Sequence, residues 1–295
     1  MQLAIRIDVD TKIGLREGVP RLLELFSRHS VRGSFFVSFG PDNSGKALRR
    51  LRQPGFLRKM WRTNPFRLYG VRTLLSGTLL PSAPIGEGAP DILKAVVGEG
   101  HELGIHGYDH VRWQDCLEEL GEEGIASELG RSVSAYERLL GTRPVSSAAP
   151  GWRCTPCSLE VQEGFRFLYA SDVRGTGPFF PVHDGRIFAT LQIPTTLPTV
   201  DELLGIEQDV NGFLLGSLAG GLNVHTIHAE VEGRAFLSSF EKFLVAVRRR
   251  DIEMVTLRAV AEQTFEKGVD DVPRLPITRG TMPGRSGWIA CQGRS

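Results

Sequence analysis

The chain has 295 residues, of which 41% are hydrophobic, so it is long and apolar enough to bury a large core. Its 35 lysine and arginine residues nearly balance its 34 aspartate and glutamate residues, which argues against a general electrostatic affinity for nucleic acid. Its 4 cysteines are too scattered to cross-link a chain of this length with disulfides. The sequence has no run of about eighteen apolar residues, which argues against a membrane-spanning segment.

The first predicted element is a strand over residues 3–10, which is largely apolar and gives way to polar residues at Thr11. Asp8 and Asp10 come at its carboxyl end. Side chains two residues apart in a strand point to the same side, so both carboxylates are expected to face one place. The alternative is that this Asp-x-Asp pair only caps a loop.

Apolar residues at helical spacing over 17–29, followed by a strand over 31–39, predict a βα unit at the start of a parallel barrel or doubly wound sheet. The pattern then changes. From Asn43 to Gly86 there is no aspartate or glutamate, and basic residues alternate with aliphatic and aromatic ones. We therefore predict a basic amphipathic insertion over about residues 43–90.

Such a segment is typical of proteins that lie on an anionic membrane, because cations meet the head groups and apolar side chains meet the acyl boundary. We expect lipid or membrane contacts from Arg58, Lys59, Trp61 and Arg62. One alternative is a solvated insertion that packs its apolar side chains inward. Another is a groove for phosphate or nucleic acid.

His106 and His110 follow a short predicted strand over residues 101–105. Two histidines four residues apart lie on one face of a helix, close enough to hold a single ion. With one carboxylate of the Asp8 and Asp10 pair they make a common catalytic metal set that leaves positions for water and substrate. The second carboxylate is then free to act as a base. The alternative is that both histidines are ordinary surface or core residues.

The rest of the chain continues the α/β pattern, with helices over 117–140 and 236–247 and strands over 144–149, 167–171, 191–193, 224–229 and 252–257. Arg153, Asp172 and His228 fall at or just past the ends of these strands. In parallel α/β folds that face holds the chemistry. Cys154 and Cys157 form an isolated C-x-x-C, for which we favour a structural role over a redox or zinc role.

Two of these segments resemble motifs of the NodB-homology polysaccharide deacetylases, a family of metal-dependent amide hydrolases on a distorted (β/α) barrel. The segment Ile7 to Asp10 resembles the first motif, which implies that Asp8 is the catalytic base and Asp10 a metal ligand. The segment 102–110 resembles the second, which implies that His106 and His110 complete the site. The resemblance implies a divalent ion, and the ligand types alone leave Zn, Mn, Co and Ni open.

Two later segments resemble further motifs of the same family. Trp152 and Arg153 resemble the third motif, which implies that Arg153 pairs with the base. His228 resembles the last, which implies a catalytic acid. We assign possible supporting roles to Trp152 and Asp172. The departures from the family pattern are the spaced Asp-Val-Asp and the Gly-Trp-Arg-Cys-Thr-Pro segment.

Several longer segments resemble one group within the family, the deformylases that act on 4-deoxy-4-formamido-L-arabinose linked to undecaprenyl phosphate. These segments cover residues 6–11, 16–24, 40–43, 193–199 and 226–233. The resemblance implies formate release from a lipid-linked sugar in lipid A modification and resistance to polymyxin and other cationic peptides. The alternatives are a cytosolic deacetylase of another N-acyl amino sugar and an inactive carbohydrate- or lipid-binding module.

The expected organisation is a barrel over residues 1–265 and a C-terminal extension over 266–295. Because the first predicted strand begins at Leu3, we expect no signal peptide and a location in the cytoplasm, on the inner face of the inner membrane. The expected partners are a lipid-linked sugar and an anionic membrane, and not nucleic acid.

Overall fold

The structure is a computed structural model that describes residues 1–46 and 73–294. Its centre is an 8-stranded parallel sheet with the order β10–β1–β2–β3–β4–β5–β8 and with β9 beside β1. The strands of this sheet are β1 (Gln2–Val9), β2 (Ser34–Val37), β3 (Glu102–Ile105), β4 (Ser146–Ser147), β5 (Tyr169–Ala170), β8 (Leu191–Gln192), β9 (Leu222–His228) and β10 (Glu253–Val255). The predicted α/β fold is thereby confirmed.

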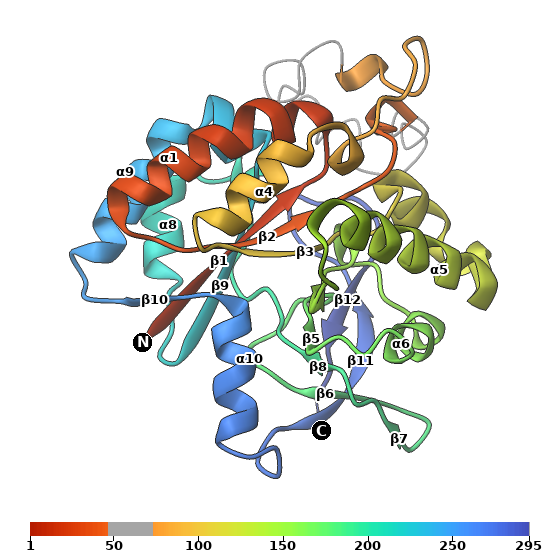
Figure 1. Cartoon of the computed structure of the whole chain (residues 1–295). Coiled ribbons are helices and arrows are strands. Elements are labelled where there is room, and N and C mark those ends of the chain that lie inside the picture. The colour runs from red at the N-terminus through yellow and green to blue at the C-terminus, as the bar shows by residue number, and fades with distance from the viewer. Residues whose placement is uncertain (47–72, 295) are drawn as a thin grey trace.

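Helices surround the sheet, with α1, α4 and α9 on one side and α5 and α6 on another (Figure 1). The described helices are α1 (Val19–His29), α4 (Pro90–Gly98), α5 (His110–Leu140), α6 (Pro156–Glu163), α7 (Val200–Leu203), α8 (Val210–Gly216), α9 (Leu237–Arg248) and α10 (Leu257–Glu266). Four shorter turns are η1 (Gly14–Gly18), η3 (Gly86–Gly88), η4 (Pro150–Trp152) and η5 (Val231–Ala235). None of the helices in the described part of the chain is long and apolar enough to cross a bilayer.

Strand β1 is buried on both faces, and besides its apolar residues it buries the charged side chains of Arg6 and Asp8. Ile5 and Ile7 pack outward against the helices, together with Phe26 of α1. Ala4 packs in a second apolar cluster with Val224 of β9. Alternate residues of β1 therefore divide between the layer under the helices and the interior of the curved sheet.

The barrel is distorted where β8 gives way to an irregular segment. The backbone N–H groups of Thr196 and Leu197 both donate to the Val224 carbonyl of β9 at 3.1 Å. These bonds join the two ends of the sheet without a regular ladder. The expectation of a distorted (β/α) barrel agrees with this geometry.

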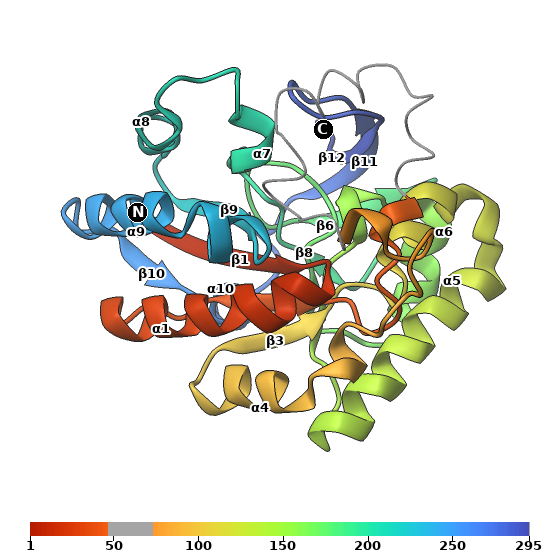
Figure 2. The same cartoon turned by 90° about the horizontal axis from the view of Figure 1, so that it is seen from above.

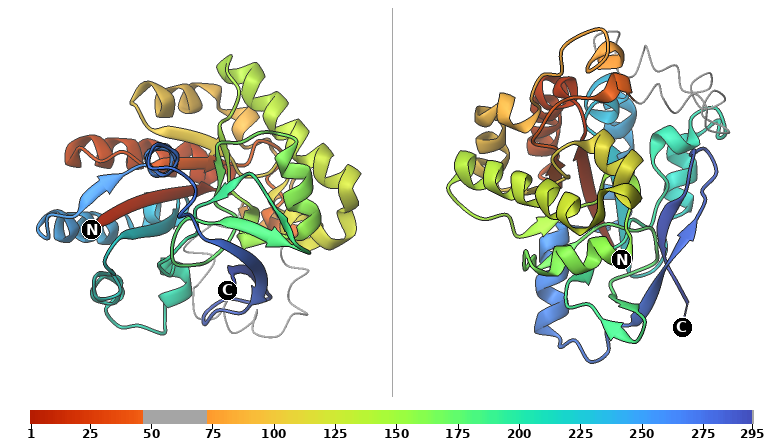
Figure 3. Two further views of the ribbon diagram at one scale, coloured as in Figure 1. Left: turned by 90° about the horizontal axis from the view of Figure 1, so that it is seen from below. Right: turned by 90° about the vertical axis from the view of Figure 1, so that its right-hand side faces the viewer.

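The C-terminal segment packs against the barrel through a second sheet with the order β12–β11–β6–β7. Its strands are β6 (Phe180–His183), β7 (Arg186–Ile187), β11 (Arg274–Gly280) and β12 (Ile289–Gln292). The N–H of Arg174, just beyond β5, donates to the Ala290 carbonyl at 2.9 Å. Figure 3 shows the blue C-terminal strands on the opposite side of the molecule from the red and yellow helices.

The predicted basic insertion is described only at its two ends. Arg58, Lys59, Trp61 and Arg62, the expected membrane contacts, lie outside the described residues. Asn43, at the start of the insertion, donates from Nδ2 to Asp109 Oδ2 at 2.6 Å. The insertion therefore leaves the barrel beside the segment that carries the two candidate metal histidines.

Candidate active site

The structure brings Asp10, His106 and His110 together at the carboxyl ends of β1 and β3. One ligand atom from each lies within 4.8 Å of the other two. His106 Nε2 is 3.3 Å from Asp10 Oδ1, and His110 Nε2 is 3.2 Å from Asp10 Oδ2. Two imidazole nitrogens and one carboxylate are a donor set for Zn²⁺ and related divalent ions, with positions left for water and substrate.

Two buried atoms of this group test whether a divalent ion fits. Asp10 Oδ1 and His106 Nε2 have no hydrogen-bond partner among the described residues. Buried polar atoms are ordinarily satisfied, so each unsatisfied one needs a physical reason. His106 Nδ1 lies 2.8 Å from the Ala148 carbonyl oxygen, which turns Nε2 toward Asp10 as an acceptor. The residues therefore fit a divalent ion.

The surroundings of Asp10 favour its anionic carboxylate form. Burial alone would raise the pKa of Asp10, but the neighbouring His110 and His106 outweigh burial and hold that pKa well below its ordinary value. The carboxylate form is the one that binds metal.

Gly107 and Asp109 place His110 beside His106. Gly107 has a φ of 68°, a left-handed conformation that glycine adopts without a Cβ clash. Asp109 is the N-cap of α5, and its Oδ1 accepts from the Val111 and Arg112 N–H groups at 3.1 Å. The helix expected over 117–140 thus begins earlier, at His110. The first turn of α5 then sets the two imidazole centroids 5.3 Å apart.

Asp8 lies beside this group and forms an ion pair with Arg6 of the same strand. Arg6 Nε donates to Asp8 Oδ1 and Arg6 Nη2 donates to Asp8 Oδ2, both at 2.7 Å. Asp8 Oδ2 also lies 3.6 Å from His106 Nε2. A bidentate guanidinium fixes the plane of the carboxylate, and each oxygen keeps a lone pair for a further proton.

Asp8 pairs with Arg6, and the expected pairing of Arg153 with Asp8 stays a prediction. The Arg153 guanidinium lies over the Trp288 ring, 4.1 Å from its centroid. In η4, Gly151 and Trp152 have φ values of 62° and 53°, so the chain reverses just before Arg153. Motif spacing does not encode that reversal.

His228 ends β9, which lies next to β1, and faces the same site. Its Nδ1 is 3.9 Å from Asp201 Oδ1 of α7. Burial would lower the pKa of His228, but Asp201, followed by Asp10 and Asp8, outweighs burial and raises that pKa above its ordinary value. A raised pKa keeps the imidazole protonated over more of the neutral range, as a proton donor requires.

His225, three residues earlier, lies in the core instead. Its ring centroid is 5.3 Å from that of Phe243, and burial lowers the pKa of His225 to about 3. Of the two histidines of this strand, the geometry therefore favours His228 as the acid.

Glu230 and Glu232 follow His228 but are only 1% exposed. Glu232 Oε2 accepts from the His228 backbone N–H at 2.8 Å, and burial raises the pKa of Glu232 to about 7. Burial, and then Asp10, raise the pKa of Glu230 well above its ordinary value. Glu232 therefore helps to hold the segment that carries His228, whereas Glu230 Oε2 has no hydrogen-bond partner among the described residues.

Trp152 and Asp172 lie near Arg6 and not among the candidate metal ligands. The Arg6 guanidinium carbon is 5.4 Å from the Trp152 ring centroid. Asp172 Oδ2 accepts from the side-chain amides of Gln162 at 2.9 Å and Gln192 at 2.8 Å, and burial raises the pKa of Asp172.

The C-x-x-C pair has the properties of a structural element. Cys154 and Cys157 are both free thiols. Burial raises the pKa of each thiol, whereas reactive cysteines have lowered pKa values.

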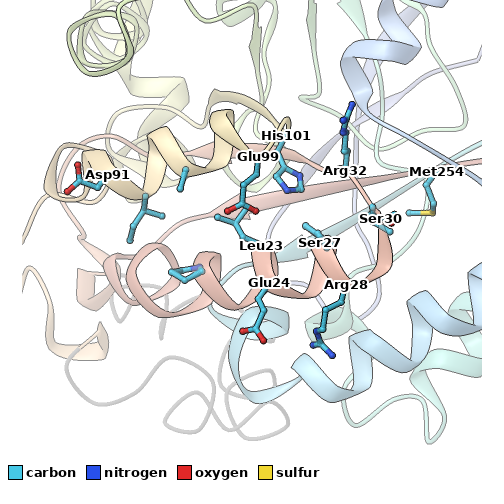
Figure 4. A pocket seen from close by; sticks show the side chains of 15 residues that line it. Leu23, Glu24, Ser27, Arg28, Ser30, Arg32, Asp91, Glu99, His101 and Met254 are labelled. Carbon is cyan, nitrogen blue, oxygen red and sulfur yellow. The ribbon is translucent and has the colours of Figure 1, made fainter.

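A large pocket of about 1010 Å³ lies elsewhere, between α1 and α4 (Figure 4). Its lining includes Ser30, Arg32, Glu99 and His101, which precede β2 and β3. It is therefore at the amino ends of these strands, the face that ordinarily serves stability and not chemistry.

Sequence reasoning assigned no role to Arg6, Asp201 or Glu232. The signal for Arg6 was present, because it shares the strand parity of Asp8. Asp201 meets His228 only through the tertiary fold, since α7 and β9 are joined by an irregular segment and α8. Glu232 is turned inward by η5, a turn that periodicity does not predict.

A family model and two full-length relatives agree on the family to which this chain is similar. Residues 4–164 match the family model described as polysaccharide deacetylase. A relative from Shewanella sediminis, "Probable 4-deoxy-4-formamido-L-arabinose-phosphoundecaprenol deformylase ArnD", is 38% identical over 297 residues, covering 99% of this chain and 94% of the relative. A protein of the same description from Wigglesworthia glossinidia brevipalpis is 36% identical over 287 residues, covering 95% and 98%.

The fold is also found in solved structures. A probable polysaccharide deacetylase from Pseudomonas aeruginosa PAO1 superimposes with a TM-score of 0.58 at 17% identity, covering 90% of this chain and 91% of that one. At this identity the likeness concerns the fold alone.

Proposed function

The chain belongs to the polysaccharide deacetylase family, and we propose that it is a metal-dependent hydrolase that removes the formyl group from 4-deoxy-4-formamido-L-arabinose linked to undecaprenyl phosphate. One observation carries the chemistry. The ligand atoms of Asp10, His106 and His110 cluster within 4.8 Å, between a carboxylate fixed by an arginine and a histidine with a raised pKa. The substrate follows from the names of the two relatives.

Amide hydrolysis is slow because resonance weakens the carbonyl as an electrophile and an amine is a poor leaving group. A divalent ion held by Asp10, His106 and His110 would supply Lewis-acid polarisation of the formyl oxygen and a lowered water pKa. The donor set accepts Zn, Mn, Co or Ni.

Asp8 is proposed as the base that removes a proton from the attacking water. Arg6 keeps the Asp8 carboxylate in one plane, with Oδ2 on the side of His106. A base held in position loses little entropy in the proton transfer. Arg6 is therefore proposed as the positioning residue that the family motif would assign to Arg153.

His228 is proposed as the acid that protonates the departing nitrogen. Asp201 faces its Nδ1, which leaves Nε2 as the nitrogen for the reaction. Hydrolysis then gives formate and a sugar with a free amine, which is cationic at neutral pH.

The proposed cellular role is lipid A modification at the cytoplasmic face of the inner membrane. Transfer of a cationic amino sugar to lipid A would reduce its attraction for polymyxin and other cationic peptides. The basic residues Arg58, Lys59 and Arg62, with Trp61, are proposed to contact the anionic membrane that presents the lipid-linked substrate.

A direct assay tests the reaction. Metal-loaded protein is incubated with membranes that contain the lipid-linked 4-formamido sugar or its 4-acetamido counterpart, and formate and acetate are measured. We expect formate from the first and little acetate from the second. Preferred release of acetate would favour a deacetylase of another N-acyl amino sugar. Release of neither would favour an inactive binding module.

A further inference from the structure

Three guanidinium groups surround one buried indole ring beside the candidate active site. The guanidinium carbons of Arg6, Arg174 and Arg285 lie 5.4, 4.7 and 4.6 Å from the Trp152 ring centroid. The ring is held in place because Trp152 Nε1 donates to Thr195 Oγ1 at 3.1 Å. The face of an indole attracts cations, so this ring gathers positive charge at one point of the site.

The three cations are unequally compensated. Arg6 is paired with Asp8 through two hydrogen bonds of 2.7 Å. Arg174 Nη2 lies 3.3 Å from Glu202 Oε2 and donates to the Leu197 carbonyl at 2.9 Å. Arg285 approaches the same carboxylate, with Nη1 3.6 Å from Glu202 Oε1.

Of the three cations, Arg285 is the one whose N–H donors are not used in hydrogen bonds to described residues. Its guanidinium makes no hydrogen bond to a residue in the described part of the chain, although the side chain is only 10% exposed. A guanidinium carries five N–H donors, and no Arg285 nitrogen is among the buried atoms that lack a partner, so an entering anion can reach these donors.

The fold connects this guanidinium to both proposed catalytic groups through neighbouring residues. Helix α7 presents Asp201 to His228 and the next residue, Glu202, to Arg285. Arg285 lies in the loop between β11 and β12, and Figure 2 shows this hairpin beside α7. Through Trp152 it also neighbours Arg6, the partner of Asp8.

We infer that Arg285 binds an anionic phosphoryl oxygen of the substrate, in the phosphodiester that joins the sugar to its lipid. This inference rests on the proposed function, which supplies a phosphodiester next to the sugar. A planar guanidinium matches the geometry of two phosphate oxygens and remains charged at any relevant pH. The C-terminal hairpin is thereby a specificity element that separates phosphate-linked sugars from neutral ones.

The test compares two soluble substrates, an alkyl phosphodiester of the 4-formamido sugar and its uncharged alkyl glycoside. For Arg285→Gln we expect kcat/KM on the phosphodiester to fall about 10-fold to 100-fold, as for the loss of a charge-assisted hydrogen bond. Activity on the alkyl glycoside is expected to stay at the wild-type level. Arg285→Lys should lose less of its kcat/KM on the phosphodiester, because lysine keeps the charge and lacks only the planar arrangement of donors.

Arg279→Gln is the matched control, because Arg279 is on the same hairpin but is 59% exposed and paired with Glu118. It should leave both substrates unaffected. Equal losses on both substrates for Arg285→Gln, no loss on either, or the same loss for Arg279→Gln would overturn the inference.

Calorimetric binding of the phosphodiester analogue separates this inference from the proposed function. If wild-type protein releases formate from neither substrate, but the analogue binds wild type and binds Arg285→Gln at least 10-fold more weakly, the deformylase proposal fails and the phosphate site stands. If the analogue binds both proteins equally, the phosphate site fails.

Discussion

Arg6, Asp8 and Asp10, three residues of the candidate site, come from one strand and the residue that follows it. Residues two apart on β1 share a face, so a single strand places an arginine, a carboxylate and, at its end, Asp10 in line. Both partners of the Arg6 and Asp8 pair are nearly inaccessible to water. Removing one partner of such a pair leaves the other charge buried without compensation.

Replacement of Arg6 tests the assignment of the partner of Asp8. We expect Arg6→Met to cost about 3–5 kcal/mol in the free energy of unfolding, the usual effect of breaking a buried ion pair, and to abolish most formate release. Arg153→Met, at a half-buried arginine stacked on Trp288, should cost much less. Urea unfolding and the formate assay measure both. A greater loss for Arg153→Met would return the role to Arg153.

The pH dependence of turnover tests His228 as the acid. The reaction needs the protonated imidazole, so the rate falls as pH rises through the His228 pKa, which Asp201 raises. Asp201→Asn removes that effect, and the alkaline limb of the kcat profile should move to lower pH. The exposed carboxylate of Asp184 provides the control, as Asp184→Asn. An alkaline limb that stays in place in Asp201→Asn would contradict the role of this pair.

At the scale of elements, the site depends on two turns that touch. A Cβ on Gly18 of η1 would lie 2.0 Å from the Ala229 carbonyl oxygen, and a Cβ on Gly233 of η5 would lie 2.7 Å from Gly18 Cα. The turns after β1 and β9 can approach this closely only because both positions lack a side chain. This contact fixes the segment that carries His228 against the segment that follows Asp10.

A methyl group at Gly18 should force the two turns apart. We expect Gly18→Ala to cost about 1–3 kcal/mol, as overpacking commonly does, and to lower kcat more than it changes metal content. Gly130→Ala, in α5, is the control. It meets nothing within 4 Å and should stabilise the protein slightly, by about 0.5–1 kcal/mol. Thermal unfolding compares the two, and an unaffected Gly18→Ala would show that the turns yield easily.

These elements also show what the sequence can and cannot predict. Apolar periodicity located β1, α1, β3, β9 and α9 to within a few residues, because each buries a regular face. Local spacing likewise pointed to Asp10, His106 and His110. The reversal before Arg153 and the approach of α7 to His228 depend on non-local packing, which no local pattern records.

At the scale of the molecule, the C-terminal segment is the part that local patterns described least. Strand β11 has mostly exposed or half-buried residues, so its sequence carries little apolar signal. Its order comes from parallel pairing with β6, almost a hundred residues earlier in the chain, and from β12. A segment predicted as an extension therefore completes the surroundings of Trp152.

Membrane association is a further property of the whole molecule. On anionic liposomes, changing Arg58, Lys59 and Arg62 together to glutamate should reduce flotation strongly, since each basic residue near such a surface contributes about 1 kcal/mol. The same change at Arg248, Arg249 and Arg250, an exposed basic run at the end of α9, is the charge-matched control. Equal loss for both triple variants would indicate a general charge effect and not a specific insertion.

The proposed mechanism requires one ion held by Asp10, His106 and His110, with Asp8 beside it as a base and not as a ligand. The direct measurement is metal content per chain together with formate release, for wild type, Asp8→Asn and His110→Ala. We expect about one ion per chain and turnover in wild type, a retained ion without turnover in Asp8→Asn, and loss of both in His110→Ala. Full metal content in His110→Ala, or turnover in Asp8→Asn, would contradict it.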